Sequence, residues 1–496
     1  MRSNHSKRLE SKFSLHKTHT QSAARAQPDL MRRPACGGRL SVITSIQLDM
    51  AADTPYSCEF FYKEQRAMDF EYLHPSDQLV MIMQRIYDRG MTTTSGGNLS
   101  ILDDNGDIWI TPKGIDKGSL TRQDIVCVKP DGTCVGPHEP SSELPFHRSI
   151  YKVRPDIRSV LHAHPPNIVA FSITRTLPNV ELLSSTYKTC GNIKLSRYAI
   201  PGSQELGDSI AKEFGNGANI VFLENHGVCV GGPNLFSAFM VFETLEYSAK
   251  LETIANKLGK PRTLSQSQMN TTETRDHLTM DDYVANTHST RECEARRDMI
   301  TLIHRSYEHG LFNATHGTYS VRLGEDSFLI TPYGKDRAYL REEDLVHIKS
   351  GMKEQGKTPS RAVRFHQMIY RLNPDIGAIL LAHPPYTMAF AVTETKFDPR
   401  TIPESYIMLR ETCKEAFGDI YKTPEAAAEK FSPAVPGIIF ENECIVMTGK
   451  NLLEAFDRLE VAEATAHSII LSHDIGKIVH ITDKEIEDLK VAFHLQ

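Results

Sequence analysis

The chain has 496 residues, which is too long for one compact core and suits two domains with tails. Its formal net charge of -6 argues against a nucleic-acid-binding surface, so no nucleic-acid partner is expected. No stretch approaches the roughly 20 apolar residues that a membrane helix needs, and no membrane partner is expected either. Nine scattered cysteines without a C-x-x-C pair are typical of reduced thiols and favour a cytoplasmic location.

Residues 1–68 are predicted to be a disordered, basic N-terminal extension. Over residues 1–49 arginine, lysine and serine are frequent, acidic side chains are few, and no apolar period of 2 or 3.6 persists. Such a start is also found in organelle transit peptides. The alternatives are a solvated tail or an upstream extension with the true start near Met50, and we favour these two.

Regular structure is expected from Ser76 onward. The first predicted element is a helix capped by Ser76 and ended by Gly90, with apolar residues at helical spacing. The elements predicted after it are strands 98–102 and 108–111, a helix after Pro145, strand 157–162, helix 204–214, strand 219–223 and helix 234–258. Because strands and helices mix without strict βαβ alternation, we expect an α/β fold with a largely antiparallel sheet covered by helices.

The second half of the chain repeats the order of the first. The run Ile-Thr-Pro-x-Gly ends at Gly114 and again at Gly334, 220 residues later, and His383 follows His164 by 219 residues. A nearly constant offset over this distance indicates a duplicated domain and not a short solenoid repeat. The predicted domains are 69–258 and 284–496, joined by a polar linker at 259–283.

A metal site is predicted from three histidines. His162 and His164 alternate along a strand and should project from the same face, and His226 follows another apolar strand, with Gly227 allowing a tight turn that aims it back. Imidazoles are good ligands for borderline divalent metals, although His-x-His alone fits two ordinary histidines as well. In the second half Leu381 and Glu443 stand at the positions of His162 and His226, as expected if these two shared a ligand.

Glu143, in the run Pro-Ser-Ser-Glu, is the candidate acid/base. A glutamate beside a three-histidine metal could complete the coordination or move protons. Its counterpart in the second half is Ala362, so it is lost together with the histidines. An exposed loop carboxylate is the usual alternative, and the joint loss argues against it.

An anion pocket is predicted beside the metal site. Backbone amides at glycines, an amide side chain, a cation and hydroxyls together suit a phosphate group. The candidate residues are Gly97, Asn98, Lys113, Gly114, Ser141 and Ser142. In the second half His316-Gly317-Thr318 and Arg361 replace several of these donors.

These motifs, in this order and spacing, resemble the class II aldolase/adducin family. The resemblance spans about residues 70–258 and 284–475 and makes 69–258 a catalytic domain and 284–496 a degenerate one. It implies two three-layer α/β/α domains, and one Zn²⁺ per chain held in the first domain by His162, His164 and His226. It also implies that Glu143 moves the proton and that the anion pocket binds the phosphate of the substrate.

The resemblance implies a zinc-dependent aldehyde-lyase that acts on a ketose phosphate, as fuculose-phosphate aldolases do, by metal-enediolate chemistry. The alternatives are a sugar-phosphate 4-epimerase, a decarboxylase or a non-catalytic, adducin-like scaffold, because the epimerases and decarboxylases share the metal ligands. The aldolases use a tyrosine from a neighbouring subunit as acid, and Tyr187 is the nearest candidate here. The family's four-fold rings imply a homo-oligomer, a dimer that forms a pseudo-tetrameric ring.

Overall fold

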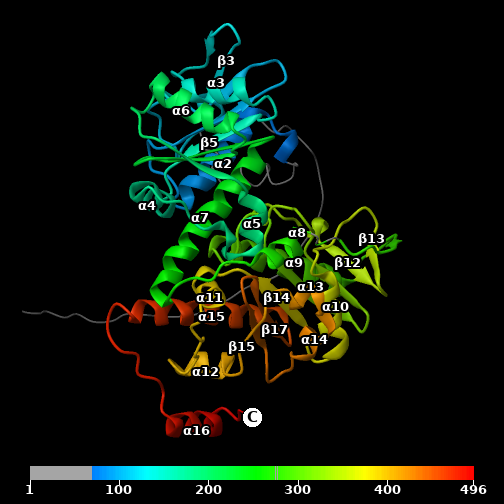
Figure 1. The fold of residues 1–496 in the computed structure, drawn as a ribbon. Helices are drawn as coiled ribbons and strands as arrows, with labels where there is room; N and C mark the ends of the chain where they lie inside the picture. Colours follow the sequence, from blue (N-terminus) through cyan, green and yellow to red (C-terminus); the bar gives the residue numbers. More distant parts are fainter. Residues whose placement is uncertain (1–69, 274, 276, 496) are drawn as a thin grey trace, which may run out of the picture. The chain divides into compact units, whose positions relative to one another are not determined.

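The computed structural model describes residues 70–273, 275 and 277–495, so the predicted extension at 1–68 lies outside the described residues. The described residues all belong to one compact unit. Within it, two copies of one α/β architecture follow each other along the chain, and each can be traced by its colours in Figure 1. We call residues 75–258 the first copy and residues 290–472 the second copy.

The first copy has eight strands and six α-helices. The strands are β1 (Asn98–Leu102), β2 (Ile108–Ile110), β3 (Val126–Val128), β4 (Cys134–Val135), β5 (Ser159–Ala163), β6 (Ile193–Ser196), β7 (Ile220–Leu223) and β8 (Gly227–Gly232). The helices are α2 (Pro75–Asp88), α3 (Leu144–Val153), α4 (Pro166–Thr174), α5 (Ser184–Cys190), α6 (Gln204–Gly215) and α7 (Leu235–Leu258).

The strands of the first copy form one sheet in the order β4-β3-β2-β1-β5-β8-β7-β6. Neighbours are antiparallel, except that β6 and β7 are parallel. Successive residues of β5 enter different cores: Leu161 packs with α2 and α7, whereas Val160 packs with α3 and α6. The sheet therefore lies between two helical layers, and His162, on the face of Val160, points toward α3.

The second copy has the same strand order with one addition. Its elements are α9 (Thr290–Glu308), β10 (Thr318–Gly324), β11 (Ser327–Ile330), β12 (Val346–Lys349), β13 (Met352–Glu354), α10 (Val363–Leu372), β14 (Ala378–Ala382), α11 (Pro385–Ala391), α12 (Pro403–Leu409), β15 (Cys413–Glu415), α13 (Asp419–Lys422), α14 (Pro424–Glu429), β16 (Gly437–Phe440), β17 (Cys444–Gly449) and α15 (Leu452–Ser472). The sheet order is β15-β16-β17-β14-β10-β11-β12-β13-β9, and α16 (Asp483–Ala492) follows the copy. The predicted fold class, two three-layer α/β/α domains with largely antiparallel sheets, is confirmed.

The segment 259–283, predicted as a linker, contains α8 (Gln266–Glu273) and β9 (Asp282–Tyr283). Strand β9 pairs in parallel with β13 at the edge of the second sheet. The short elements β3, β4, β6, α4 and α5 were not predicted, because runs of so few residues carry little periodicity.

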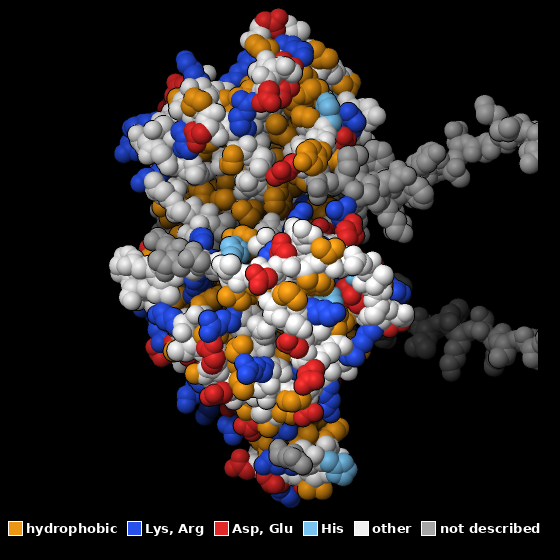
Figure 2. Space-filling model, turned by 90° about the vertical axis from the view of Figure 1, so that its right-hand side faces the viewer, with side chains coloured by type: hydrophobic (Ala, Val, Ile, Leu, Met, Phe, Trp, Pro, Cys, Tyr) orange, Lys and Arg blue, Asp and Glu red, His pale blue; other side chains and the backbone are white. Residues whose placement is uncertain are grey.

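The two copies contact each other through buried polar side chains. Arg85 on α2 donates to the carboxylate of Asp336 and to the hydroxyl of Tyr307 on α9. The same hydroxyl donates to Glu243 on α7. No helix within the described residues is long and apolar enough to cross a membrane. Figure 2 shows acidic and basic side chains interspersed on the face in view, as the near balance of charges in the sequence predicts.

Candidate active site

Three histidines from two chain segments meet at one edge of the first sheet. His162 is on β5, His164 follows the end of β5, and His226 lies in the turn between β7 and β8. Because β5 pairs with β8, this turn is held beside the end of β5. One ring nitrogen from each histidine lies within 4.8 Å of the others. Among the described residues, these three are the one group of metal-ligand side chains of this size.

Two glycines permit this close approach. A Cβ atom on Gly227 would lie 2.6 Å from the carbonyl oxygen of Ala163 and 2.7 Å from the ring of His164. A Cβ atom on Gly97 would lie 2.8 Å from the carbonyl oxygen of His162. Gly227 thus allows the predicted tight turn through the space that it leaves and not through its own conformation, because the left-handed residue of the turn is Asn225, with φ of 56°.

Glu143 lies at the N-terminus of α3, facing the histidines. Its Oε2 atom is 3.3 Å from Nε2 of His162, and its Oε1 atom is 3.8 Å from Nε2 of His226. The side-chain amide of Asn98 donates to Oε2 at 2.7 Å. Oε1 is buried and has no hydrogen-bond partner. One carboxylate oxygen is thus held in place, and the other is left for a ligand.

A buried chain of hydrogen bonds orients Asn98. His147 on α3 contacts the Asn98 Oδ1 atom through Nε2 at 2.6 Å, and its Nδ1 contacts the Ser100 hydroxyl at 2.6 Å. Tyr151 contacts the same hydroxyl at 2.6 Å. Burial, opposed by Glu143, lowers the pKa of His147 to about 3, so its ring is neutral, with one donor and one acceptor nitrogen. With Nε2–H donating to Oδ1, the Asn98 amide group is directed at Glu143.

His147 was not among the predicted site residues, although the sequence marks it. The pair Phe-His is repeated at Phe365-His366, and in the second copy His366 and Tyr370 contact Ser320 in the same way. There the chain of hydrogen bonds ends, because Thr318 replaces Asn98 and Nε2 of His366 has no partner. Both copies therefore have this histidine, but only His147 is linked to a carboxylate, because it orients Asn98, which donates to Glu143.

The histidines of the first copy are in the form that binds metals. Burial, reinforced by neighbouring histidines, lowers the pKa of His162 and of His164 to about 3 each, and burial also lowers the pKa of His226. Nδ1 of His162 lies 2.9 Å from the carbonyl oxygen of Val228, so its proton is held there and Nε2 presents a lone pair. Three neutral imidazoles with a buried, unpartnered carboxylate oxygen fit a divalent metal.

The predicted anion-pocket residues lie on three neighbouring loops. The backbone N–H of Ser141 donates to the carbonyl oxygen of Thr111, and the backbone N–H of Lys113 donates to the carbonyl oxygen of Glu139. These two hydrogen bonds join the loop that contains Gly114 to the loop that contains Ser142. Asn98 begins β1 beside the end of β5, and Gly97 precedes it. The structure therefore brings Gly97, Asn98, Ser141 and Ser142 to the same sheet edge as Glu143. Two of the predicted phosphate donors have partners within the protein. The half-exposed Lys113 forms an ion pair with Glu139 at 3.1 Å, and the side-chain amide of Asn98 donates to Glu143.

Tyr187 lies on α5. This helix contacts the second copy: Ser184 donates its hydroxyl to Glu443 at 2.8 Å. The role of Tyr187 as an acid stays a prediction.

The family model described as the class II aldolase and adducin N-terminal domain matches residues 77–253 and 297–470. This chain belongs to that family and carries two copies of its domain in tandem, as the sequence motifs predict.

Curated relatives match about one copy of the domain. A 5-deoxy-D-ribulose 1-phosphate aldolase from Bacillus thuringiensis is 30% identical over 196 residues, or 39% of this chain and 91% of the relative. An L-fuculose phosphate aldolase from Methanocaldococcus jannaschii is 34% identical over 185 residues, or 37% and 97%. A 3-oxo-tetronate 4-phosphate decarboxylase from Pectobacterium atrosepticum is 32% identical over 178 residues, or 35% and 81%.

A solved structure of an L-fuculose 1-phosphate aldolase is also similar to the chain. It has 31% sequence identity and a TM-score of 0.37, and the match covers 40% of this chain and 93% of that one.

Proposed function

We propose that the first copy is a zinc-dependent lyase that cleaves a carbon–carbon bond in a ketose phosphate. The observation that carries this proposal is the placement of Glu143 within 3.3 Å of His162 and 3.8 Å of His226, beside three histidines whose nitrogens lie within 4.8 Å. Aldolases that act on 5-deoxy-D-ribulose 1-phosphate and L-fuculose phosphate are among the relatives, which supports a phosphorylated ketose as substrate.

His162, His164 and His226 would hold the metal ion. Bound there, a zinc ion would act as a Lewis acid that draws electron density from the substrate carbonyl. The chain itself keeps the ligands neutral and aimed inward, because the carbonyl oxygen of Val228 fixes the proton of His162 on Nδ1.

Glu143 is the group that would move the proton. Its Oε2 atom is held by Asn98, so the unpartnered Oε1 atom is the one able to take a proton from a substrate hydroxyl or return it to carbon. The phosphate would lie against the backbone amides and hydroxyls of Gly97, Ser141 and Ser142, at the edge of the sheet that also carries Glu143.

A decarboxylase is the second candidate. It is favoured by the relatives that are 3-oxo-tetronate 4-phosphate decarboxylases, which are about as similar to the chain as the aldolases are. The same metal and carboxylate serve either bond cleavage, so the substrate decides between the two.

The first measurement is the zinc content of the purified, zinc-loaded chain. We expect one ion per chain, lost in His162→Ala, and His383→Ala in the second copy is the matched control that should keep it. A chain without bound metal would exclude the lyase. Assays of ketose phosphates for aldehyde release and of 3-oxo acid phosphates for CO₂ release then separate the two candidates.

The homodimer that builds a pseudo-tetrameric ring and the cytoplasmic location stay predictions. Light scattering tests the first: we expect the mass of two chains, and a monomer would contradict the ring.

A further inference from the structure

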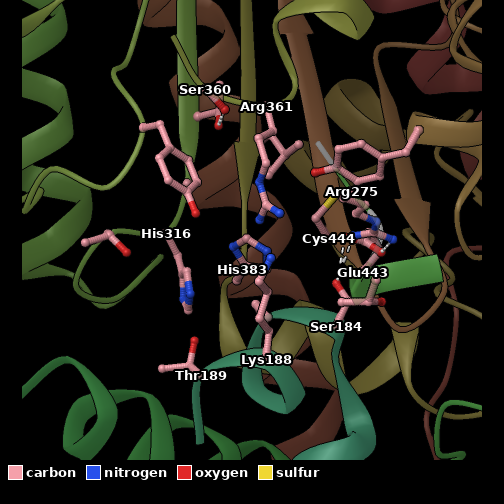
Figure 3. Close-up of a pocket in the computed structure, with 18 of the residues that line it drawn as sticks. Ser184, Lys188, Thr189, Arg275, His316, Ser360, Arg361, His383, Glu443 and Cys444 are labelled. Atoms are coloured by element: carbon pink, nitrogen blue, oxygen red, sulfur yellow. Dashed lines mark hydrogen bonds and ion pairs between the residues drawn. The ribbon is translucent and has the colours of Figure 1, made fainter. Parts of the chain in front are cut away.

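The second copy has a cavity of about 350 Å³ at the end of its sheet. It is lined by segments that correspond to the candidate active site of the first copy, and Thr318 pairs with Leu381 across β10 and β14 as Asn98 pairs with His162 across β1 and β5. Residues from α5 and the segment after α8 complete its wall, among them Ser184, Lys188 and Arg275. Figure 3 shows these side chains around the cavity.

The residues that replace the metal ligands cannot hold a metal. Leu381 has no donor atom, and Ala362 stands in place of the glutamate. Glu443 accepts two hydrogen bonds of 2.7 Å from Arg275, and both side chains are only 6% exposed. Its carboxylate is therefore neutralised by an arginine that the first copy's site does not contain.

The cavity carries an excess of positive charge. Among the described residues that line it, four side chains are cationic, Lys188, Arg275, Arg337 and Arg361, and one is a carboxylate, Glu443. Arg337 is buried and donates only to the carbonyl oxygens of Gly317, Pro332 and Lys335. Burial, partly offset by Asp336, lowers the pKa of Arg337 to about 10, which leaves it charged at neutral pH.

Arg361 supplies an unused donor. Its Nη1 atom is buried without a hydrogen-bond partner, and its guanidinium lies 5.3 Å from the centre of the Tyr333 ring. In Figure 3 the side chains of Arg361 and Lys188 extend from opposite walls toward His383, whose Nδ1 atom is also buried and unpartnered. The Nη1 atom of Arg361 is a buried donor without an acceptor, which is costly, so this atom calls for an anionic acceptor in the cavity that it lines.

We propose that this cavity binds the phosphate group of a small phosphorylated metabolite without a metal ion. The planar fork of Arg361 and the ammonium of Lys188 match the charge and geometry of a phosphate, and the hydroxyl of Ser360 lies next to Arg361 in the same wall. The volume is at the lower end of the range for small-molecule sites, about 300–1,000 Å³, which limits the ligand to a compact molecule. The second copy is then a ligand-binding domain.

The test is a titration of the full-length, zinc-loaded chain with glycerol 3-phosphate. Calorimetry measures the binding, and hydrogen exchange measures the protection of peptides from α5 and around Arg361. We expect binding that protects both peptides and that persists in His162→Ala and after treatment with a chelator. Arg361→Ser, which installs the serine of the first copy, should weaken this binding about tenfold or more. Its matched control, Ser142→Ala in the first copy, should leave the protection of these peptides unchanged.

Four results would overturn the proposal: no protection of these peptides, loss of the protection when zinc is removed, unchanged affinity in Arg361→Ser, or tighter binding of malonate than of glycerol 3-phosphate.

Lys188→Met is a second variant on the opposite wall and should also weaken binding several-fold. Because Arg361 has an unpartnered donor, we expect Arg361→Ser without ligand to unfold at the same temperature as the parent chain. A much lower temperature would assign Arg361 a structural role instead.

Discussion

At the scale of single residues, the duplicated histidine on α3 and α10 allows a test with an internal control. We expect His147→Phe to lower kcat for the proposed lyase reaction by about 10- to 100-fold, because Asn98 loses the partner that orients it toward Glu143. The zinc content should stay at one per chain. Steady-state kinetics and metal analysis measure both quantities.

The control for this prediction is His366→Phe. It removes the same contact to a serine hydroxyl, but Nε2 of His366 has no partner and leads to no carboxylate. We therefore expect a similar loss of stability, about 1–2 kcal/mol, and no change in kcat. Equal losses of activity in both variants would show that His147 acts only through folding.

Gly227 gives a second prediction at this scale. In Gly227→Ala the new methyl group would meet the backbone of Ala163 and the ring of His164, so we expect a loss of about 1–3 kcal/mol in the free energy of unfolding, together with weaker zinc binding. Urea unfolding and metal analysis measure these changes. In Gly215→Ala, at the end of α6, the nearest atom is 4.0 Å away, and this control should cost little.

At the scale of elements, a carboxylate fixes the helix that follows the His-x-His segment. Glu246 on α7 accepts from the backbone N–H of Ile168 at 3.0 Å and from the Asn167 side chain at 2.6 Å, at the N-terminus of α4. Burial raises the pKa of Glu246, opposed by these hydrogen bonds. We expect Glu246→Ala to lower the free energy of unfolding by about 1–3 kcal/mol, because it leaves buried donors unpaired.

Urea unfolding measures this loss, and Glu252→Ala is the control on the same helix. Glu252 accepts from the backbone N–H of Asn179, which precedes a single 3-10 turn (Val180–Leu182) and not an α-helix. A larger loss in Glu252→Ala would contradict the special role of Glu246. In the second copy Glu463 accepts from the backbone N–H groups of Tyr386 and Thr387 at the start of α11, so both copies have this arrangement although they differ in their histidines.

The long elements could be predicted from the sequence, and the contacts between elements could not. Helix α7 was expected at 234–258 and spans Leu235–Leu258, because its apolar period persists over many turns. Strand β5 begins at Ser159 and not at 157, because the backbone N–H of Ile157 bonds to Arg154 in a turn instead of to a neighbouring strand. The three histidines and Glu143 could be named from the sequence, since the second copy keeps only the counterpart of His164 and lacks those of His162, His226 and Glu143. The repeated Phe-His pair marks His147 as a residue present in both copies, but its role depends on a contact with Asn98, 49 residues away, which only the structure shows.

At the scale of the whole molecule, buried neutral histidines make the fold sensitive to acid. Burial lowers the pKa of His366 to about 3, and no charged neighbour contributes to that shift. Between pH 6.5 and 3 the unfolded chain binds a proton at this histidine and the folded chain does not, so stability falls as the pH falls through this window. Each such histidine contributes a slope of about 1.4 kcal/mol per pH unit. His366→Phe should therefore unfold with a shallower pH dependence than the parent chain between pH 6 and 4, measured by urea unfolding at each pH. If the free energy of unfolding had the same pH dependence in both chains, His366 would become protonated in the folded chain. Its buried site would then accept a charge, contrary to the lowered pKa.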